Sequence, residues 1–121
     1  MGKYVDGFVI PIPTKNVEKY REIAQKAGEV WKEHGALEYF EAVGDDLDIE
    51  KMVSFKQIAG AGEDETVIFA WIVYESREQR DKVNALVMED ERLTEMMGGD
   101  EEKPFDYKRM AYGGFKIIVE A

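Results

Sequence analysis

The segment TVIFAWIVY, residues Thr66 to Tyr74, constrains the fold of this chain more than any other segment. It is a nearly unbroken run of β-branched and aromatic residues without a single charge. This pattern is typical of a strand that is buried on both faces of its sheet. We therefore predict a strand here and expect it to be central in its sheet.

The remaining elements follow from the spacing of apolar residues and from capping signals. Apolar residues spaced three and four apart from Val17 onward predict an amphipathic helix that ends at Gly35. Ser76 and Gln79 form a capping-box pattern that predicts the start of a second helix. Gly113 and Gly114 in the last strand indicate a bulge, a kink or the close approach of another backbone. The predicted strands are 4–12, 37–45, 66–74 and 108–119, and the predicted helices are 17–35 and 76–90.

The order of these elements is β-α-β-β-α-β, the split ferredoxin-like motif of α+β proteins. It implies an antiparallel four-stranded sheet with two helices on one face. A length of 121 residues is that of one domain, so residues 1–121 are predicted to form a single domain. Residues 46–64 are an insertion between the second and third strands, and we interpret its acidic start as a solvated hairpin tip. Residues 98–106 are predicted to form a loop.

The large apolar residues on the predicted strands indicate that the chain associates with a second chain. Side-chain directions alternate along a strand, so these residues cannot all lie under two helices. A second sheet must cover the others, and a second copy of the chain is the obvious supplier of that sheet. We predict a homodimer in which two sheets form one barrel. The residues are Phe8, Ile10, Phe69, Trp71, Tyr112 and Phe115.

Composition and charge exclude several classes of partner. Sixteen Lys and Arg against twenty-six Asp and Glu give a net charge of −10, and no basic stripe is visible, which argues against nucleic acid. The chain has one histidine and no cysteine, so we predict neither a disulfide nor a metal site, and no cofactor. No signal peptide is recognisable and no apolar run is long enough to span a membrane, so we expect a cytoplasmic protein without a membrane partner.

Four long blocks resemble the bacterial family DUF1428, a domain of unknown function. They are YVDGFVIPIP, WKEHGALEYFEA, ETVIFAWIVYESREQRDKVN and KPFDYKRMAYGGFK, and the similarity runs from about Tyr4 to Val119. The chain departs from the family pattern in two places. Glu91 stands where the family has a proline, and the insertion after Asp46 is specific to this chain. The resemblance implies a dimeric α/β barrel, the superfamily that includes small cofactor-free monooxygenases, muconolactone isomerase and chlorite dismutase. It implies no settled activity.

Three charged residues within predicted strands are candidates for a site. Asp6, Glu41 and Arg109 would be costly to bury alone, so each should pair, face water or serve a site. A structural ion pair of Arg109 with Asp6 or Glu41 across adjacent strands is one interpretation. The other is catalytic, with Arg109 holding an anionic or carbonyl oxygen while Asp6 or Glu41 handles a proton.

His34, at the end of the first predicted helix, also has two interpretations. As a helix end it would interact with the last carbonyl groups, a role that requires no other partner. As a general acid or base it would lie at the rim of a cavity and need a polar neighbour.

Aromatic and basic residues complete the set of candidates. Trp71, Tyr112 and Tyr39 are predicted to line a binding site for an aromatic ligand. A role in the hydrophobic core explains these three residues equally well. We interpret Arg80, with Asp81 and Asn84, as an anchor of the second helix to the following loop or to the partner subunit.

The leading functional hypothesis is a homodimer with a small, largely apolar cavity on the open face of each sheet. The cavity would bind, and in an enzyme transform, a small aromatic or carbonyl-bearing metabolite, by proton transfer or cofactor-free oxidation. The alternative is a non-catalytic, dimeric binding or stress-related protein whose cavity is only packed core. The sequence leaves open whether the protein is an enzyme and which molecule it binds.

Overall fold

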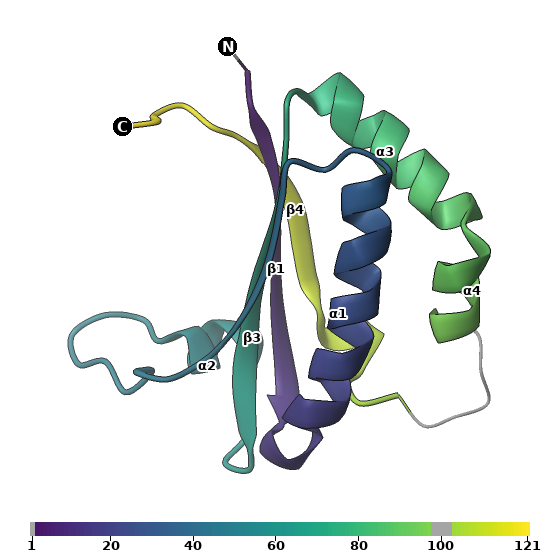
Figure 1. Ribbon diagram of the computed structural model, residues 1–121. Helices are drawn as coiled ribbons and strands as arrows, with labels where there is room; N and C mark the ends of the chain where they lie inside the picture. The colour runs from purple at the N-terminus through teal and green to yellow at the C-terminus, as the bar shows by residue number, and fades with distance from the viewer. Residues whose placement is uncertain (1, 98–102) are drawn as a thin grey trace.

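The computed structural model describes residues 2–97 and 103–121, so part of the predicted loop, 98–102, lies outside the described residues (Figure 1). The described elements follow the predicted β-α-β-β-α-β order, with short helices added to it. They are β1 (Tyr4–Pro13), α1 (Val17–Glu33), β2 (Glu38–Val43), α2 (Phe55–Ala59), β3 (Glu65–Tyr74), α3 (Arg77–Glu89), α4 (Glu91–Met97) and β4 (Ala111–Lys116), with 3-10 turns at Thr14–Asn16 and Tyr107–Arg109. No helix among these is long and apolar enough to cross a membrane.

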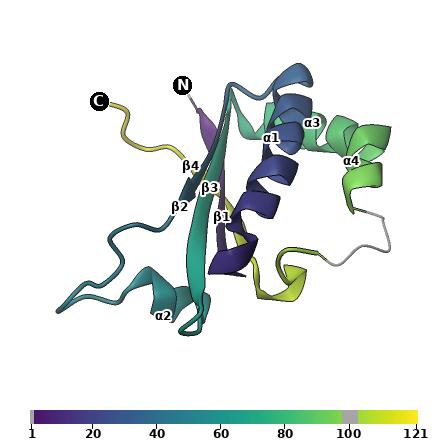
Figure 2. The same cartoon turned by 60° about the horizontal axis from the view of Figure 1, so that its bottom comes forward.

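The four strands form one antiparallel sheet in the order β2-β3-β1-β4. The predicted central position of the TVIFAWIVY strand is confirmed, because Trp71 on β3 lies opposite Gly7 of β1 on one side and Phe40 of β2 on the other. Figures 1 and 2 show α1, α3 and α4 on one face of this sheet. The architecture is ferredoxin-like.

The hydrophobic core lies between the sheet and these helices. Residues with even numbers on β1 and β3 point toward the helices, and Ile12 and Tyr74 among them are completely buried. From the helices, Val30 of α1 and Val87 of α3 pack into the same layer. Burial of each such side chain contributes roughly 1.5–3 kcal/mol.

The opposite face of the sheet carries the other large apolar residues, as the alternation predicted. Phe69 is 44% exposed and Phe115 is 60% exposed. The rings of Phe40, Trp71 and Phe69 form a row, with centroids 5.2 and 5.3 Å apart. None of the three helices that cover the core reaches this open face (Figure 1).

The insertion is more ordered than predicted, since it contains helix α2. Ser54 accepts a hydrogen bond from the backbone of Gln57, and the Gln57 side chain accepts one from the backbone of Ser54, which completes a capping box. Gly60 ends the helix in the left-handed conformation with φ of 68°. This arm projects from the side of the sheet opposite α1, α3 and α4 (Figure 2), and Phe55 contacts Phe69.

The last strand is shorter than the predicted 108–119. Asp106 accepts a hydrogen bond from the backbone of Lys108, and Tyr107–Arg109 is a 3-10 turn, so Arg109 precedes the strand. The predicted close approach occurs at Gly114, although the neighbour is a side chain. A Cβ atom there would lie 2.5 Å from the hydroxyl oxygen of Tyr4.

The capping box predicted at the start of α3 is half present. Ser76 accepts a hydrogen bond from the backbone of Gln79, but the Gln79 side chain accepts one from the backbone of Glu75 and not from Ser76.

Candidate functional site

A cavity of about 610 Å³ lies between the sheet and the helices. Ile10, Ala70 and Ile72 of the sheet form its floor, and Ala27 and Trp31 of α1 lie on the opposite wall. This cavity is on the helix-covered face; the predicted cavity on the open face requires a second copy of the chain and stays a prediction. Small residues on the inner side of α1 and short side chains on β3 leave space in the layer that the helices cover.

Asp6 forms one polar end of this cavity. Its side chain is 1% exposed, on the helix-covered face of β1. Oδ2 accepts a long hydrogen bond of 3.4 Å from Asn84, whereas Oδ1 accepts none from the part of the chain that the structure describes. A guanidinium nitrogen of Arg80 lies 3.7 Å from Oδ1, which is an ion-pair distance but not a hydrogen bond.

Asn84 is held in one orientation by two donors. The indole nitrogen of Trp31 and the hydroxyl of Tyr74 both donate to its Oδ1, at 3.1 and 3.2 Å. The amide nitrogen of Asn84 must then point away from them, toward Asp6.

Arg80 is held beside Asp6 by two tyrosines of the sheet, and its predicted anchoring to the partner subunit stays a prediction. Its two terminal nitrogens donate to the hydroxyl groups of Tyr112 and Tyr4, at 3.1 and 3.3 Å. Its guanidinium also lies over the Tyr4 ring, 4.9 Å from the centroid. Asp81 provides a second carboxylate 3.2 Å from Nε.

The protonation of Asp6 is set by opposing effects. Burial raises the pKa of Asp6 above its ordinary value, and the positive charge of Arg80, the Asn84 hydrogen bond and the nearby hydroxyl groups of Tyr112 and Tyr74 reduce the rise. A carboxyl group with a raised pKa in a cavity binds a proton more readily than an exposed carboxyl group does, which suits it to proton transfer.

Glu41 of β2 forms the other polar end. Tyr20 donates to its Oε1 at 2.5 Å and Tyr39 donates to its Oε2 at 2.6 Å. Burial raises the pKa of Glu41, although both hydrogen bonds oppose the rise. Gly28 of α1 makes room for this group, because a Cβ atom there would lie 2.8 Å from the Tyr39 ring.

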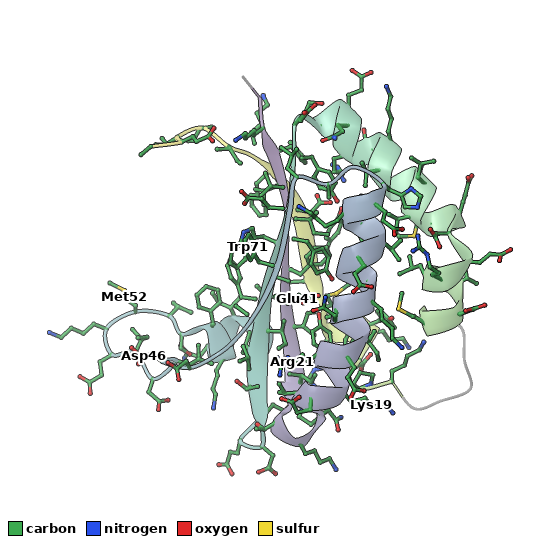
Figure 3. The ribbon with its side chains drawn as sticks, in the orientation of Figure 1. Lys19, Arg21, Glu41, Asp46, Met52 and Trp71 are labelled. Carbon is green, nitrogen blue, oxygen red and sulfur yellow. The ribbon has the colours of Figure 1, made fainter. Side chains whose placement is uncertain are left out.

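The two carboxyl groups are too far apart to act on each other directly. Asp6 lies opposite Ile72 of β3 and Glu41 lies opposite Ala70. Two strand spacings and a two-residue offset put their Cα atoms roughly 12 Å apart. Figure 3 shows Glu41 between the sheet and α1, and Trp71 on the other side of the sheet.

Arg109 lies outside this cavity. It makes two hydrogen bonds of 2.8 Å to the Glu65 carboxylate and one of 2.7 Å to the carbonyl oxygen of Gly60. The hydrogen bonds from Arg109 and from the backbone of Gly62 lower the pKa of Glu65 to about 2. The predicted pairing of Arg109 with Asp6 or Glu41 is therefore wrong, because the turn before β4 directs Arg109 to the start of β3.

His34 also lies away from the cavity lining. It is the C-cap of α1, and its Nε2 is 2.8 Å from the carboxylate of Asp90 between α3 and α4. Hydrogen bonds from Arg92 and His34 hold the pKa of Asp90 well below its ordinary value. The His34 side chain therefore pairs with the Asp90 carboxylate and not with the last carbonyl groups of α1.

Four predicted residues line the cavity, and three lie elsewhere. The cavity includes Asp6, Glu41, Tyr39 and Tyr112, whereas His34, Arg109 and Trp71 are outside it. Their functional roles stay predictions. The sequence reasoning missed Tyr20 and Trp31, which the helical spacing of α1 presented only as apolar positions. In residues 2–97 and 103–121, no three His, Asp or Glu side chains gather as metal ligands would.

The chain is similar in sequence to a family of proteins whose function is unknown. The model of a family described as a protein of unknown function (DUF1428) matches residues 3–107. The uncharacterized protein YbaA of Escherichia coli is 44% identical over 118 residues, which cover 98% of each chain. The protein of the same name from Shigella flexneri matches equally.

Two solved structures share the fold at low sequence identity. A dimeric ferredoxin-like protein from an uncultured marine organism has a TM-score of 0.63 at 8% identity, with 100% of both chains covered. A nipsnap family protein of unknown function from Agrobacterium tumefaciens has a TM-score of 0.62 at 13% identity, with 96% and 88% covered. At these identities the likeness shows the fold alone.

Proposed function

Because the chain belongs to the DUF1428 family, whose function is unknown, we propose a function from the geometry of its cavity. Each protomer binds a small aromatic or carbonyl-bearing molecule there and exchanges a proton with it through Asp6. One observation carries this proposal: Asp6 Oδ1 is buried in the wall of an apolar cavity without a hydrogen-bond partner among the described residues. Such an atom costs about 1–3 kcal/mol unless a ligand satisfies it.

The neighbours of Asp6 support the proposed proton transfer. Its carboxylate accepts a proton from an acidic C–H or O–H bond of the bound molecule, and the electron pair of that bond stays on the molecule. Asp6 then returns the proton to another atom of the same molecule, so nothing is oxidised. Arg80, 3.7 Å from Oδ1, favours the charged carboxylate that accepts the proton, and Asn84 holds that carboxylate in place.

We also propose that the protein is a homodimer formed through the open face of the sheet. Phe40, Phe69 and Phe115 are between 44% and 60% exposed there, which is unusual for large aromatic residues of a monomer. The fold is shared with a protein described as dimeric. Two such faces in contact would bury the aromatic row of both copies.

Ligand binding can be tested with the two tryptophans, because they lie on opposite faces of the sheet. Trp31 lines the cavity, whereas Trp71 lies on the open face. In the variant Trp71→Phe, small aromatic ketones and phenols are expected to quench the remaining fluorescence of Trp31. In the matched variant Trp31→Phe they are expected to have little effect. Quenching only in Trp31→Phe would contradict binding in this cavity.

Proton exchange is tested by NMR in deuterated water with a molecule that binds and carries an exchangeable C–H bond. The wild-type protein is expected to speed its deuteration, and Asp6→Asn is expected to remove most of that effect. Asp81→Asn is the matched control, because it removes an equal charge beside Arg80 outside the cavity. Binding without exchange would support the non-catalytic alternative.

The homodimer is tested by light scattering after size-exclusion chromatography. Phe69→Glu is expected to give a monomer, because it puts a charge in the proposed interface. Leu86→Glu is the matched control, since Leu86 is similarly exposed, at 49%, on α3. A monomeric wild-type protein, or a dimer of Phe69→Glu as stable as the wild type, would overturn this proposal.

A further inference from the structure

The wall of the cavity is acidic. Asp6 and Glu41 are its carboxyl groups, and none of the described residues that line it is Lys, Arg or His. The nearest positive charge is Arg80, which lies within ion-pair distance of both Asp6 and Asp81. One guanidinium therefore faces two carboxylates, and no positive charge is left over for an anionic ligand.

Most hydrogen-bond donors of the wall are used within the protein. Tyr20 and Tyr39 donate to Glu41, and Trp31 donates to Asn84. The amide nitrogen of Asn84 itself points at Asp6. The wall offers a ligand one buried acceptor, Oδ1 of Asp6, which has no hydrogen-bond partner among the described residues.

From this arrangement we infer that the molecule bound in the cavity is neutral, that it donates a hydrogen bond from a hydroxyl group such as a phenol to Asp6 Oδ1, and that carboxylates are excluded. The inference rests on the proposed function and names its ligand class. A phenol satisfies Oδ1 and covers the apolar floor with its ring. A carboxylate would add an unpaired negative charge between two existing carboxyl groups.

Three naphthalene derivatives of similar size separate these properties. At pH 7, 2-naphthol is neutral and has a donor, 2-methoxynaphthalene is neutral without a donor, and 2-naphthoate is an anion. Isothermal titration calorimetry gives their dissociation constants. A hydrogen bond to a carboxylate is expected to favour 2-naphthol over 2-methoxynaphthalene by about ten- to a hundredfold. The naphthoate is expected to bind most weakly.

Variants assign this preference to Asp6. Asp6→Asn replaces one acceptor oxygen by a donor, so the preference for 2-naphthol over 2-methoxynaphthalene is expected to fall by about tenfold. Asp81→Asn removes the same charge from the other side of Arg80 and is expected to keep the preference for 2-naphthol over 2-methoxynaphthalene.

The outcomes distinguish the inference from the proposal beneath it. If either 2-naphthoate or 2-methoxynaphthalene binds as tightly as 2-naphthol, the inferred ligand class is wrong, but the proposal that the cavity binds a small molecule is not contradicted. If the Asp6→Asn variant keeps the full preference, Asp6 is not the acceptor and the inference is overturned. If none of the three compounds binds, the proposed binding function fails and the inference fails with it.

Discussion

Replacement of Asp6 by asparagine is expected to stabilise the folded protein. The carboxyl group is 1% exposed, and one of its oxygens has no hydrogen-bond partner in residues 2–97 and 103–121. Asparagine has nearly the same shape and carries no charge to desolvate. Arg80 is not left alone in the variant, because Asp81 stays 3.2 Å from it. A residue that is kept at a cost in stability is typical of a functional site.

The expected gain follows from the cost of this buried group. Burying the charged carboxylate with one oxygen unsatisfied costs about 1–3 kcal/mol more than burying a neutral amide, and the loss of the attraction of Arg80, at 3.7 Å without a hydrogen bond, offsets part of that. We expect a net increase of about 1–2 kcal/mol in the free energy of unfolding at neutral pH. For a chain of this length the melting temperature should rise by roughly 4–10 °C.

The gain should depend on pH. Because burial raises the pKa of Asp6 above its ordinary value of 3.8, the folded protein holds this proton at pH values where the unfolded chain has lost it. The wild-type protein therefore loses stability as the pH rises from the ordinary pKa through the raised one. Asparagine does not titrate, so the advantage of the variant should be small in acid and should grow as the pH rises through the raised pKa of Asp6.

Urea denaturation followed by circular dichroism measures both effects. Wild type, Asp6→Asn and the control Asp81→Asn are compared at about pH 3 and about pH 7. Asp81 is 61% exposed, so its replacement should change stability little at either pH. A destabilised Asp6→Asn variant at neutral pH, or an equal gain at both pH values, would refute the reasoning.

Three further changes test the surroundings of the cavity. Gly28→Val should cost about 1–3 kcal/mol, because its Cβ atom would lie 2.8 Å from the Tyr39 ring; an unchanged melting temperature would contradict this expectation. Tyr20→Phe leaves one oxygen of the buried Glu41 without its donor and should also cost about 1–3 kcal/mol in urea denaturation, more at neutral pH than in acid. His34→Gln should leave ligand quenching of Trp31 fluorescence unchanged, because His34 pairs with a carboxylate outside the cavity lining; lost quenching would restore its predicted role.

The sequence determined the elements and their order, because the spacing of apolar residues is a local property. An uncharged run such as TVIFAWIVY favours a central strand, and its place in the sheet was readable for that reason, although Phe69 on its open face is 44% exposed in the single chain. Helix α2 was also readable in principle, since Ser54 and Gln57 have the spacing of a capping box. The alternating side-chain directions along the strands likewise predicted an apolar face of the sheet that the helices do not cover.

The sequence also singled out Asp6 and Glu41, because a charge within an apolar strand is conspicuous wherever it points. It did not determine their partners. Asn84 lies 78 positions from Asp6 along the chain, and Tyr20 lies 21 positions from Glu41. A strand shows which of its residues share a face, but not which face the helices will cover or which side chains those helices bring.

Only the tertiary structure decided that both carboxyl groups line one cavity and that Arg109 does not. The packing of α1 and α3 across the sheet set Arg80 beside Asp6, and the turn before β4 sent Arg109 to Glu65. These contacts join segments distant in sequence, so they depend on how helices and sheet pack together. Local patterns of charge and hydrophobicity contain no record of that packing.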